Sequence, residues 1–143
     1  MAQDAVALGR RVARRFMPRG LRPKPSDLAG QMKVEVVLLE APPPAQSASG
    51  GLRSEYTATP PRITIYTGPI NSLAVAIHAN QRFDMMRCDL AELHIAHELF
   101  HHLESGQRFG PLTREEVEAA AHSFAKELLG ADFEPEELSE LLG

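Results

Sequence analysis

Apolar residues near the start of the chain recur at helical spacing, three or four positions apart, with arginines between them: Ala5, Leu8, Val12 and Phe16. This spacing places the apolar side chains on one face of a helix and the arginines on the other. The helix should end before Pro18, because a residue that precedes proline disfavours helical geometry. We therefore predict a basic amphipathic helix followed by a Pro-rich linker over residues 1–25.

The next part of the chain carries short runs rich in β-branched, aromatic and other apolar residues, which are typical of strands. The runs cover residues 33–40, 54–58 and 62–66. Ser26 can cap a short helical turn before the first run. Residues 41–52, rich in Pro, Ala, Ser and Gly, should form a flexible loop. Pro60 and Pro61 cannot donate hydrogen bonds to a sheet and should separate the last two runs, so we expect a small sheet of about three strands.

The rest of the chain has a helical pattern. We expect helices over residues 69–78, 89–106, 114–129 and 135–142. Pro69 suits the first turn of a helix. Asp89 with Glu92, and Thr113 with Glu116, have the spacing of a capping box, in which two side chains bond to each other's backbone at a helix start. A helix, then strands, then helices in sequence favour an α+β fold.

Length and composition indicate a single globular domain over residues 1–143. No apolar run is long enough to cross a bilayer, so we expect no membrane contact. The lone Cys88 cannot form an internal disulfide, and the start of the chain lacks the apolar stretch of a secretory signal. Both observations favour a cytoplasmic protein.

Charge is unevenly distributed, although the net charge is only −4. Acidic residues are concentrated near the end of the chain and basic residues near its start, at Arg10, Arg11, Arg14, Arg15, Arg19, Arg22 and Lys24. A basic cluster of this kind can bind nucleic acid or an acidic lipid surface, and it is also found in organellar transit peptides. We favour a solvated helix face that pairs with the acidic C-terminal region, and expect no direct nucleic-acid partner.

The segment from His97 to His101 reads HELFH, which matches the pattern H-E-x-x-H. On a helix this spacing places the two imidazoles one turn apart on the same face, so both can bind one metal ion. Zinc accepts neutral imidazole, and a catalytic zinc site has three protein ligands and one open position. Glu98 lies about 100° around the helix from His97, where it can accept the proton of a water molecule. The segment therefore predicts a Zn²⁺ site with Glu98 as general base.

A third ligand must come from another part of the chain, and the helix over 114–129 offers several acids. Glu118 is our choice, because it lies closest to the buried apolar stripe of that helix. His122, four residues later, shares this side and can orient a ligand. The alternative is a solvated Glu118; Glu104, three residues after His101, would then be the reserve ligand.

Two segments around these residues resemble the ImmA/IrrE family of gluzincin-type zinc metallopeptidases. Residues 96–101 read AHELFH, and the twelve residues from Glu118 read EAAAHSFAKELL. The family typically shows AHE-x-x-H and then E-x-x-A-(N/D)-x-F-A-x-x-L-L. The resemblance implies a zincin-like fold in which His97, His101 and Glu118 bind zinc and Glu98 is the general base.

The chain departs from the family pattern at two positions. His122 stands where Asn or Asp is usual, and Gly130 follows the double Leu where the family has Met-Pro. Known members often cut transcriptional repressors encoded nearby, so the resemblance implies a repressor-like protein as the substrate. A DNA-binding partner encoded separately is a further implication, with the basic N-terminal helix as its candidate docking surface.

Several other side chains are weaker candidates for the site. His94 can be an alternative ligand or a donor to the transition state, although helix packing is the favoured role. His102, four residues after Glu98, can bond to that carboxylate or lie exposed. Tyr56 and Tyr66 can donate a hydrogen bond to a substrate oxygen, although packing against the sheet is more common for tyrosine.

We predict an α+β, zincin-like domain with a small three-stranded sheet and an active-site helix that carries HExxH. Its predicted function is zinc-dependent endopeptidase activity on a protein or peptide through a metal-activated water. Two alternatives stay open. One is a non-catalytic metal-binding sensor or scaffold, with His94 or Glu104 closing the coordination shell. The other is a regulatory protein-binding or DNA-associated module in which the histidines are incidental.

Overall fold

The computed structural model describes residues 2–43, 52–80, 89–106, 109–130, 133 and 135–142. Cys88, most of the predicted loop over 41–52 and the side chain of His78 lie outside the described residues. The described helices are α1 (Ala2–Arg14), the short 3-10 helix η1 (Pro18–Gly20), α2 (Pro25–Gln31), α4 (Thr67–Asn80), α5 (Leu90–Gly106), α6 (Arg114–Leu129) and α7 (Pro135–Leu142). The strands are β1 (Glu35–Leu39), β2 (Ser54–Ala58) and β3 (Pro61–Tyr66). The fold is α+β, as predicted.

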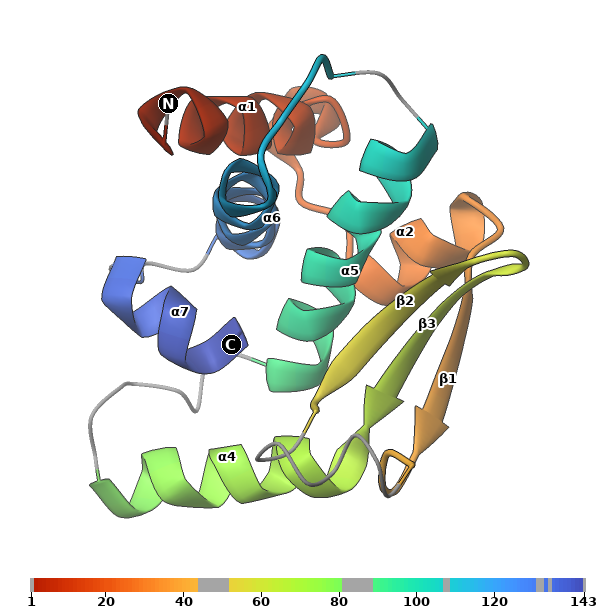
Figure 1. The fold of residues 1–143 in the computed structure, drawn as a ribbon, viewed down its shortest axis with the longest axis vertical. Helices are drawn as coiled ribbons and strands as arrows, with labels where there is room; N and C mark the ends of the chain where they lie inside the picture. The colour runs from red at the N-terminus through yellow and green to blue at the C-terminus, as the bar shows by residue number, and fades with distance from the viewer. Residues whose placement is uncertain are drawn as a thin grey trace.

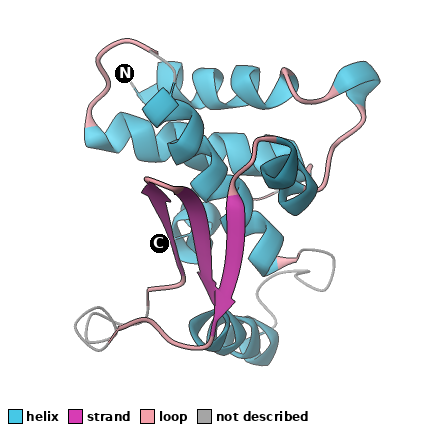
Figure 2. Ribbon diagram, turned by 90° about the vertical axis from the view of Figure 1, so that its right-hand side faces the viewer, coloured by secondary structure: helices cyan, strands magenta, loops and turns pink. Residues whose placement is uncertain are grey.

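The three strands form one mixed sheet in the order β1-β3-β2 (Figures 1 and 2). β1 runs parallel to β3, and β2 runs antiparallel to it. Pro61 is the first residue of β3 and lies opposite Ala58 in the register, so the strand begins one residue earlier than expected. A proline at the first position of a strand is tolerated because the ladder there does not require its N–H.

The sheet packs its inner face against α5, and α2 lies beside β1 on the same side (Figure 1). Ile63 and Ile65 of β3 are fully buried on this face. Ser54 and Tyr56 of β2 lie opposite Ile65 and Ile63 in the antiparallel register. Side chains opposite each other in a sheet share a face, so Ser54 and Tyr56 are both directed toward α5.

The helix α5 lies between the sheet and α6 and is buried along most of its length (Figure 1). Leu93, Leu99 and Phe100 are fully buried, and Phe124 and Leu128 of α6 complete this part of the core. Each such side chain contributes roughly 1.5–3 kcal/mol when it is removed from water. The expectation that this helix is mostly buried is confirmed.

The starts of α2 and α5 both differ from the prediction: α2 has another N-cap residue, and the Glu92 side chain expected in the capping box of α5 bonds to Ser26. Lys24, not Ser26, is the N-cap residue of α2, and it makes no side-chain cap bond. The backbone N–H and the hydroxyl of Ser26 instead donate to the carboxylate of Glu92 in α5. Asp89 does cap α5 by accepting from the Glu92 N–H. Glu92 thus stabilises the start of α2, because a carboxylate binds the free N–H groups and favours the positive end of the helix dipole.

The predicted boundaries of α6 are confirmed. Thr113 and Glu116 form a complete capping box, with both reciprocal hydrogen bonds present. Gly130 ends the helix in the left-handed conformation, with φ of 69°. Among the described helices, none has the length and apolar content that a bilayer-spanning segment requires.

The helix α1 packs closely on α6 at Gly9. A Cβ added to Gly9 would lie 2.1 Å from the carbonyl oxygen of Ala120 and 2.9 Å from Cβ of Ser123. One turn earlier, the Ser123 hydroxyl donates a hydrogen bond of 2.6 Å to the carbonyl oxygen of Val6. The absence of a side chain at Gly9 therefore permits the two helix backbones to approach each other.

Three residues of the basic cluster gather around Glu127 of α6. Arg10, Arg14 and Arg22 place guanidinium nitrogens 3.5, 3.8 and 3.7 Å from its carboxylate. Arg22 also donates to the backbone carbonyl of Glu127. For these three arginines the structure confirms the expected pairing with an acidic residue of the C-terminal region.

We expect Gly9→Ala to destabilise the protein by about 1–3 kcal/mol, the usual cost of overpacking a close contact, because the new methyl group must push α1 away from α6. Urea unfolding followed by circular dichroism measures this change. Gly30→Ala in α2 is the matched control, since an added Cβ there meets nothing within 4 Å. Alanine is also the better helix former, so Gly30→Ala should be neutral or stabilising. Equal stability of Gly9→Ala and wild type would contradict the proposed close contact.

Candidate metal centre

The structure brings His97, His101 and Glu118 together between α5 and α6. Nε2 of His97 lies 3.2 Å from Oε2 of Glu118, and Nε2 of His101 lies 3.3 Å from Oε1. Each of the three residues offers one ligand atom, and these atoms all lie within 4.8 Å of one another. The two helices thus assemble the three residues predicted as metal ligands into a cluster that can hold a metal ion.

The donor set and its spacing fit a divalent metal. Zinc bonds to imidazole nitrogen and carboxylate oxygen are about 2.0–2.2 Å long, so neighbouring ligand atoms of a tetrahedral site lie roughly 3.3 Å apart. The His97–Glu118 and His101–Glu118 separations are close to this value. Two imidazoles and one carboxylate suit zinc, but other first-row divalent ions accept the same ligands, so the geometry leaves the identity of the metal open.

The electrostatics of the cluster follow from the pairing of its carboxylate with the imidazoles. Hydrogen bonds from His101 and His97 lower the pKa of Glu118 below its ordinary value, so this acid stays ionised. Burial by itself disfavours a charged His101, but the hydrogen bond to Glu118 and the nearby negative charges outweigh burial and raise the pKa of His101. A metal bound here would take the place of the proton through which His101 bonds to Glu118.

Glu98 is buried beside the cluster, with 6% of its surface exposed. Its Oε2 accepts a hydrogen bond of 2.7 Å from the hydroxyl of Ser54 and lies 3.7 Å from Nδ1 of His97. Sequence reasoning missed Ser54, which lies in β2, 44 residues before Glu98. Strand alternation places Ser54 and Tyr56 on one face of the sheet, but the sequence holds no signal that this face meets α5 at Glu98.

His94 is a buried structural residue and not a metal ligand. Its Nε2 lies 2.9 Å from the carbonyl oxygen of Leu141 in α7, and its Nδ1 lies 3.1 Å from the Ser54 hydroxyl. Burial and the neighbouring His97 lower the pKa of His94 to about 3, so the ring is neutral. A neutral ring that donates to Leu141 from Nε2 can only accept at Nδ1, so it competes with Glu98 for the single proton of the Ser54 hydroxyl. His94 therefore has the packing role that we favoured, and it ties α7 to α5.

Arg53 reinforces the attachment of α7 from the neighbouring end of β2. Its guanidinium donates to the carbonyl oxygens of Glu140 and Leu141, at 3.1 and 3.2 Å. Leu141 thus accepts hydrogen bonds from both the sheet and α5. These bonds place the end of α7 beside the candidate site.

His102 has neither of the two roles that we considered, whereas Tyr56 and Tyr66 pack within the protein, the more common role for tyrosine. The Tyr56 hydroxyl lies 2.7 Å from Nδ1 of His102, so His102 bonds to β2 and not to Glu98. Tyr66 follows a core-facing residue of β3, so its side chain lies on the other face of the sheet, where its hydroxyl donates to Glu55. Burial and Glu55 together raise the pKa of Tyr66 to about 12. Tyr66 is therefore no candidate for binding a substrate oxygen.

His122 lies next to Glu118, as expected, but forms no hydrogen bond with it. Nε2 of His122 is 3.8 Å from Oε2 of Glu118, and its ring centroid is 5.3 Å from that of His97. Burial and the nearby His97 lower the pKa of His122 to about 4, so its ring is neutral. Its Nε2 is buried and has no hydrogen-bond partner among the described residues. Glu104 lines the same cleft but does not belong to the ligand cluster.

The cluster lies in a cleft of about 1150 Å³ between β2, α5, α6 and α7, which we call the metal cleft. His97 is buried at 6% exposure, whereas the side chain of Glu118 is 42% exposed, so the cluster is reached from the α6 side. Comparison of the chain with protein-family models, curated proteins and solved structures finds no match.

We expect metal-free protein to become less stable as pH falls, partly because of His94. Its folded pKa of about 3 lies below the ordinary value of 6.5. The contribution of His94 to stability is therefore complete above about pH 6.5. It is lost as pH falls from 6.5 toward 3, because between these two values only the unfolded chain binds the proton. Each such proton changes the free energy of unfolding by about 1.4 kcal/mol per pH unit.

Glutamine can keep the hydrogen bond to Leu141 but does not titrate, so His94→Gln should show a smaller loss of stability between pH 6.5 and 4.5. Urea unfolding of chelator-treated wild type and variant at several pH values measures the two slopes. All other titratable groups are common to both chains. Parallel slopes would contradict a neutral, buried His94.

Proposed function

We propose that the chain is a zinc-dependent metallopeptidase with a zincin-like fold, as its resemblance to the ImmA/IrrE family implies. One observation carries this proposal: His97, His101 and Glu118 converge in an open cleft that also contains the buried carboxylate of Glu98. A purely structural metal site would not require an additional acid beside it. A catalytic site does require one, as a proton acceptor.

The chain's own residues divide the chemistry among them. When bound by the three ligands, zinc supplies polarisation of the substrate carbonyl and lowers the pKa of a water molecule. Ser54 holds Oε2 of Glu98, which leaves Oε1 to accept the proton of the attacking water. The protonated Glu98 carboxyl then delivers this proton to the leaving amine nitrogen as the peptide bond breaks. Nδ1 of His94 lies 3.1 Å from the same Ser54 hydroxyl.

The position of β2 supports a peptide as the substrate. β2 is an edge strand of the sheet, and residues Leu52 to Tyr56 line the metal cleft. An extended peptide can add to a free strand edge through main-chain hydrogen bonds. Such pairing would hold a peptide beside Glu98 largely independently of its sequence. A repressor-like protein as the natural substrate is supported by the family resemblance alone. No feature of the cleft indicates it.

Metal content tests the ligand set. Wild type purified without chelator should contain about one zinc per chain, since three ligands from two packed helices form the site. His97→Ala and Glu118→Ala should each lose most of it by elemental analysis. Glu115→Ala, which removes an exposed acid of the same helix, is the matched control and should keep it. Absence of metal from wild type, or its retention in both ligand variants, would refute the site.

The role of Glu98 has a separate test. Glu98→Gln should keep zinc but lower the rate of hydrolysis of unfolded casein by at least about 100-fold, because an amide cannot accept the proton. Glu104→Gln, which alters another acid of the metal cleft, should retain activity within a few-fold of wild type. Proteolysis by Glu98→Gln at the wild-type rate would exclude Glu98 as general base.

A closed, non-catalytic metal site is a second candidate function, and His122 is the observation that favours it. Its buried Nε2 has no hydrogen-bond partner among the described residues and lies 3.8 Å from Glu118, so a small shift would make it a fourth ligand. His94 and Glu104, the residues we first considered for this role, are not placed in the cluster. X-ray absorption of the zinc-loaded chain distinguishes two imidazole ligands from three.

A further inference from the structure

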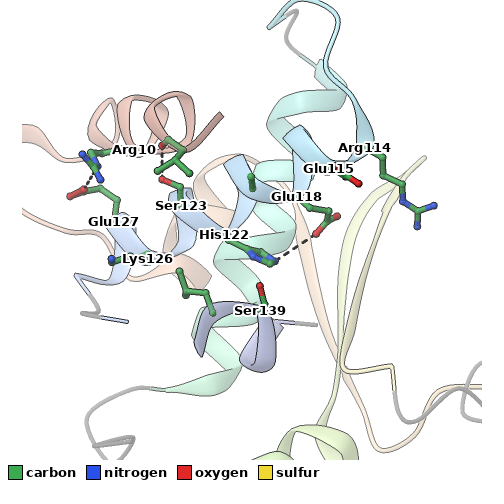
Figure 3. A pocket seen from close by; sticks show the side chains of 12 residues that line it. Arg10, Arg114, Glu115, Glu118, His122, Ser123, Lys126, Glu127 and Ser139 are labelled. Atoms are coloured by element: carbon green, nitrogen blue, oxygen red, sulfur yellow. Dashed lines mark hydrogen bonds and ion pairs between the residues drawn. The ribbon is translucent and has the colours of Figure 1, made fainter. Parts of the chain in front are cut away.

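A second cleft, of about 770 Å³, lies between α1, α6 and α7 (Figure 3). We call it the α1–α6–α7 groove. Val6 of α1, Ala119 of α6 and Leu138 of α7 give it apolar walls. Val6 is a large apolar residue with 39% of its surface exposed. The groove therefore offers apolar surface that the core does not cover.

The groove and the metal cleft meet at the candidate metal ligand of α6. Four residues line both cavities: Arg114, Glu118, His122 and Ser139. In Figure 3 the side chains of Glu118 and His122 point toward each other from α6, with α1 on one side and the strands beyond on the other. A chain bound at β2 that passes Glu118 thus continues into the groove.

The junction holds a buried polar atom that lacks a partner among the described residues, Nε2 of His122. Leaving such an atom without a hydrogen bond is unfavourable, typically by about 1–3 kcal/mol. The main chain of a bound peptide carries both donors and acceptors, so either tautomer of His122 can bond to it. This atom marks the junction as a place where a ligand completes the structure.

The charges at the groove favour an apolar ligand group over a charged one. Arg10 and Glu127 are both partly exposed at the groove and pair with each other at 3.5 Å. Glu127 pairs with Arg14 and Arg22 as well as with Arg10, so a charged ligand group would compete with existing ion pairs and gain little, as exposed ion pairs are weak. An apolar side chain would gain by covering Val6 and Ala119, which the core does not fully bury.

We propose that the α1–α6–α7 groove is a specificity pocket that binds an apolar side chain of the peptide substrate, on the side of the cut bond away from β2. His122 positions the peptide main chain at the entrance. This inference rests on the proposed function, since a substrate side chain reaches the groove only if a peptide binds in the metal cleft. Arg114 and Ser139, which line both cavities, form the rest of the entrance.

Two small hydroxamic acids distinguish binding at the metal from binding in the groove. Acetohydroxamic acid carries only the metal-binding group, whereas 4-methylpentanohydroxamic acid adds a branched apolar tail. Calorimetry with the zinc-loaded full chain should give the branched compound at least about tenfold higher affinity, because its extra carbons are buried in the groove. Only the branched compound should also shift the methyl NMR signals of Val6 and Leu138, and neither compound should shift those of Leu21, which is 70% exposed elsewhere.

Val6→Asp places a carboxylate in the groove wall and should remove the tenfold gain, while leaving the affinity for acetohydroxamic acid unchanged. Val75→Asp is the matched control and should keep the gain, since Val75 is 68% exposed on α4 and lines neither cavity. Both valines lie on exposed helix faces, so neither variant disturbs the core.

Each other outcome overturns the inference for a distinct reason. Failure of acetohydroxamic acid to bind would refute the metal centre, and the pocket with it. Binding of both compounds with equal affinity would refute the pocket and leave the metal centre intact. If wild type is a dimer by light scattering and Val6→Asp is a monomer, a second copy of the chain occupies the groove, and the substrate does not.

Discussion

The burial of α5 between the sheet and α6 is the constraint on which the candidate site depends. A helix covered on two sides has no free rotation about its axis, so the directions of its side chains are fixed. His97 and His101 are thereby directed at α6, while Glu98 and His94 meet Ser54 of β2. The apolar side chains of α5 supply the rigidity that the polar side chains require.

Most of the polar groups that α5 buries bond to three other elements, and this network orders the surroundings of the site. Nδ1 of His97 has no hydrogen-bond partner among the described residues. The Ser54 hydroxyl donates to Glu98 and lies 3.1 Å from Nδ1 of His94, and His94 bonds to the last turn of α7. Glu92 bonds to the first turn of α2. A buried polar group without a partner is costly, so each of these bonds restricts where its partner element can pack. Helices distant in sequence are thus held in register with the metal ligands.

The sequence predicted local structure and the ligand cluster more completely than the network around them. Helical periodicity and capping residues define α5 and α6 well, and the spacing of His97, His101 and Glu118 places all three on facing sides of those helices. The bond of Ser54 to Glu98 and the bond of Glu92 to the start of α2 could not be predicted in the same way. Both depend on which elements meet in space, which periodicity does not encode.

The docking of α1 controls the third ligand, because Glu118 lies on α6 and α6 is held from its outer side by α1. Gly9 permits the close approach at Ala120, Ser123 bonds to α1 one turn from Glu118, and the arginines gather on Glu127 further along. Glu118 itself is partly exposed, and among the described residues its carboxylate contacts imidazoles alone, two of which are candidate metal ligands. Its position therefore depends on the helix that carries it more than on contacts of its own. The basic face of α1 thus supports the candidate metal site indirectly, by fixing α6 at a distance from α5 that a single ion could span.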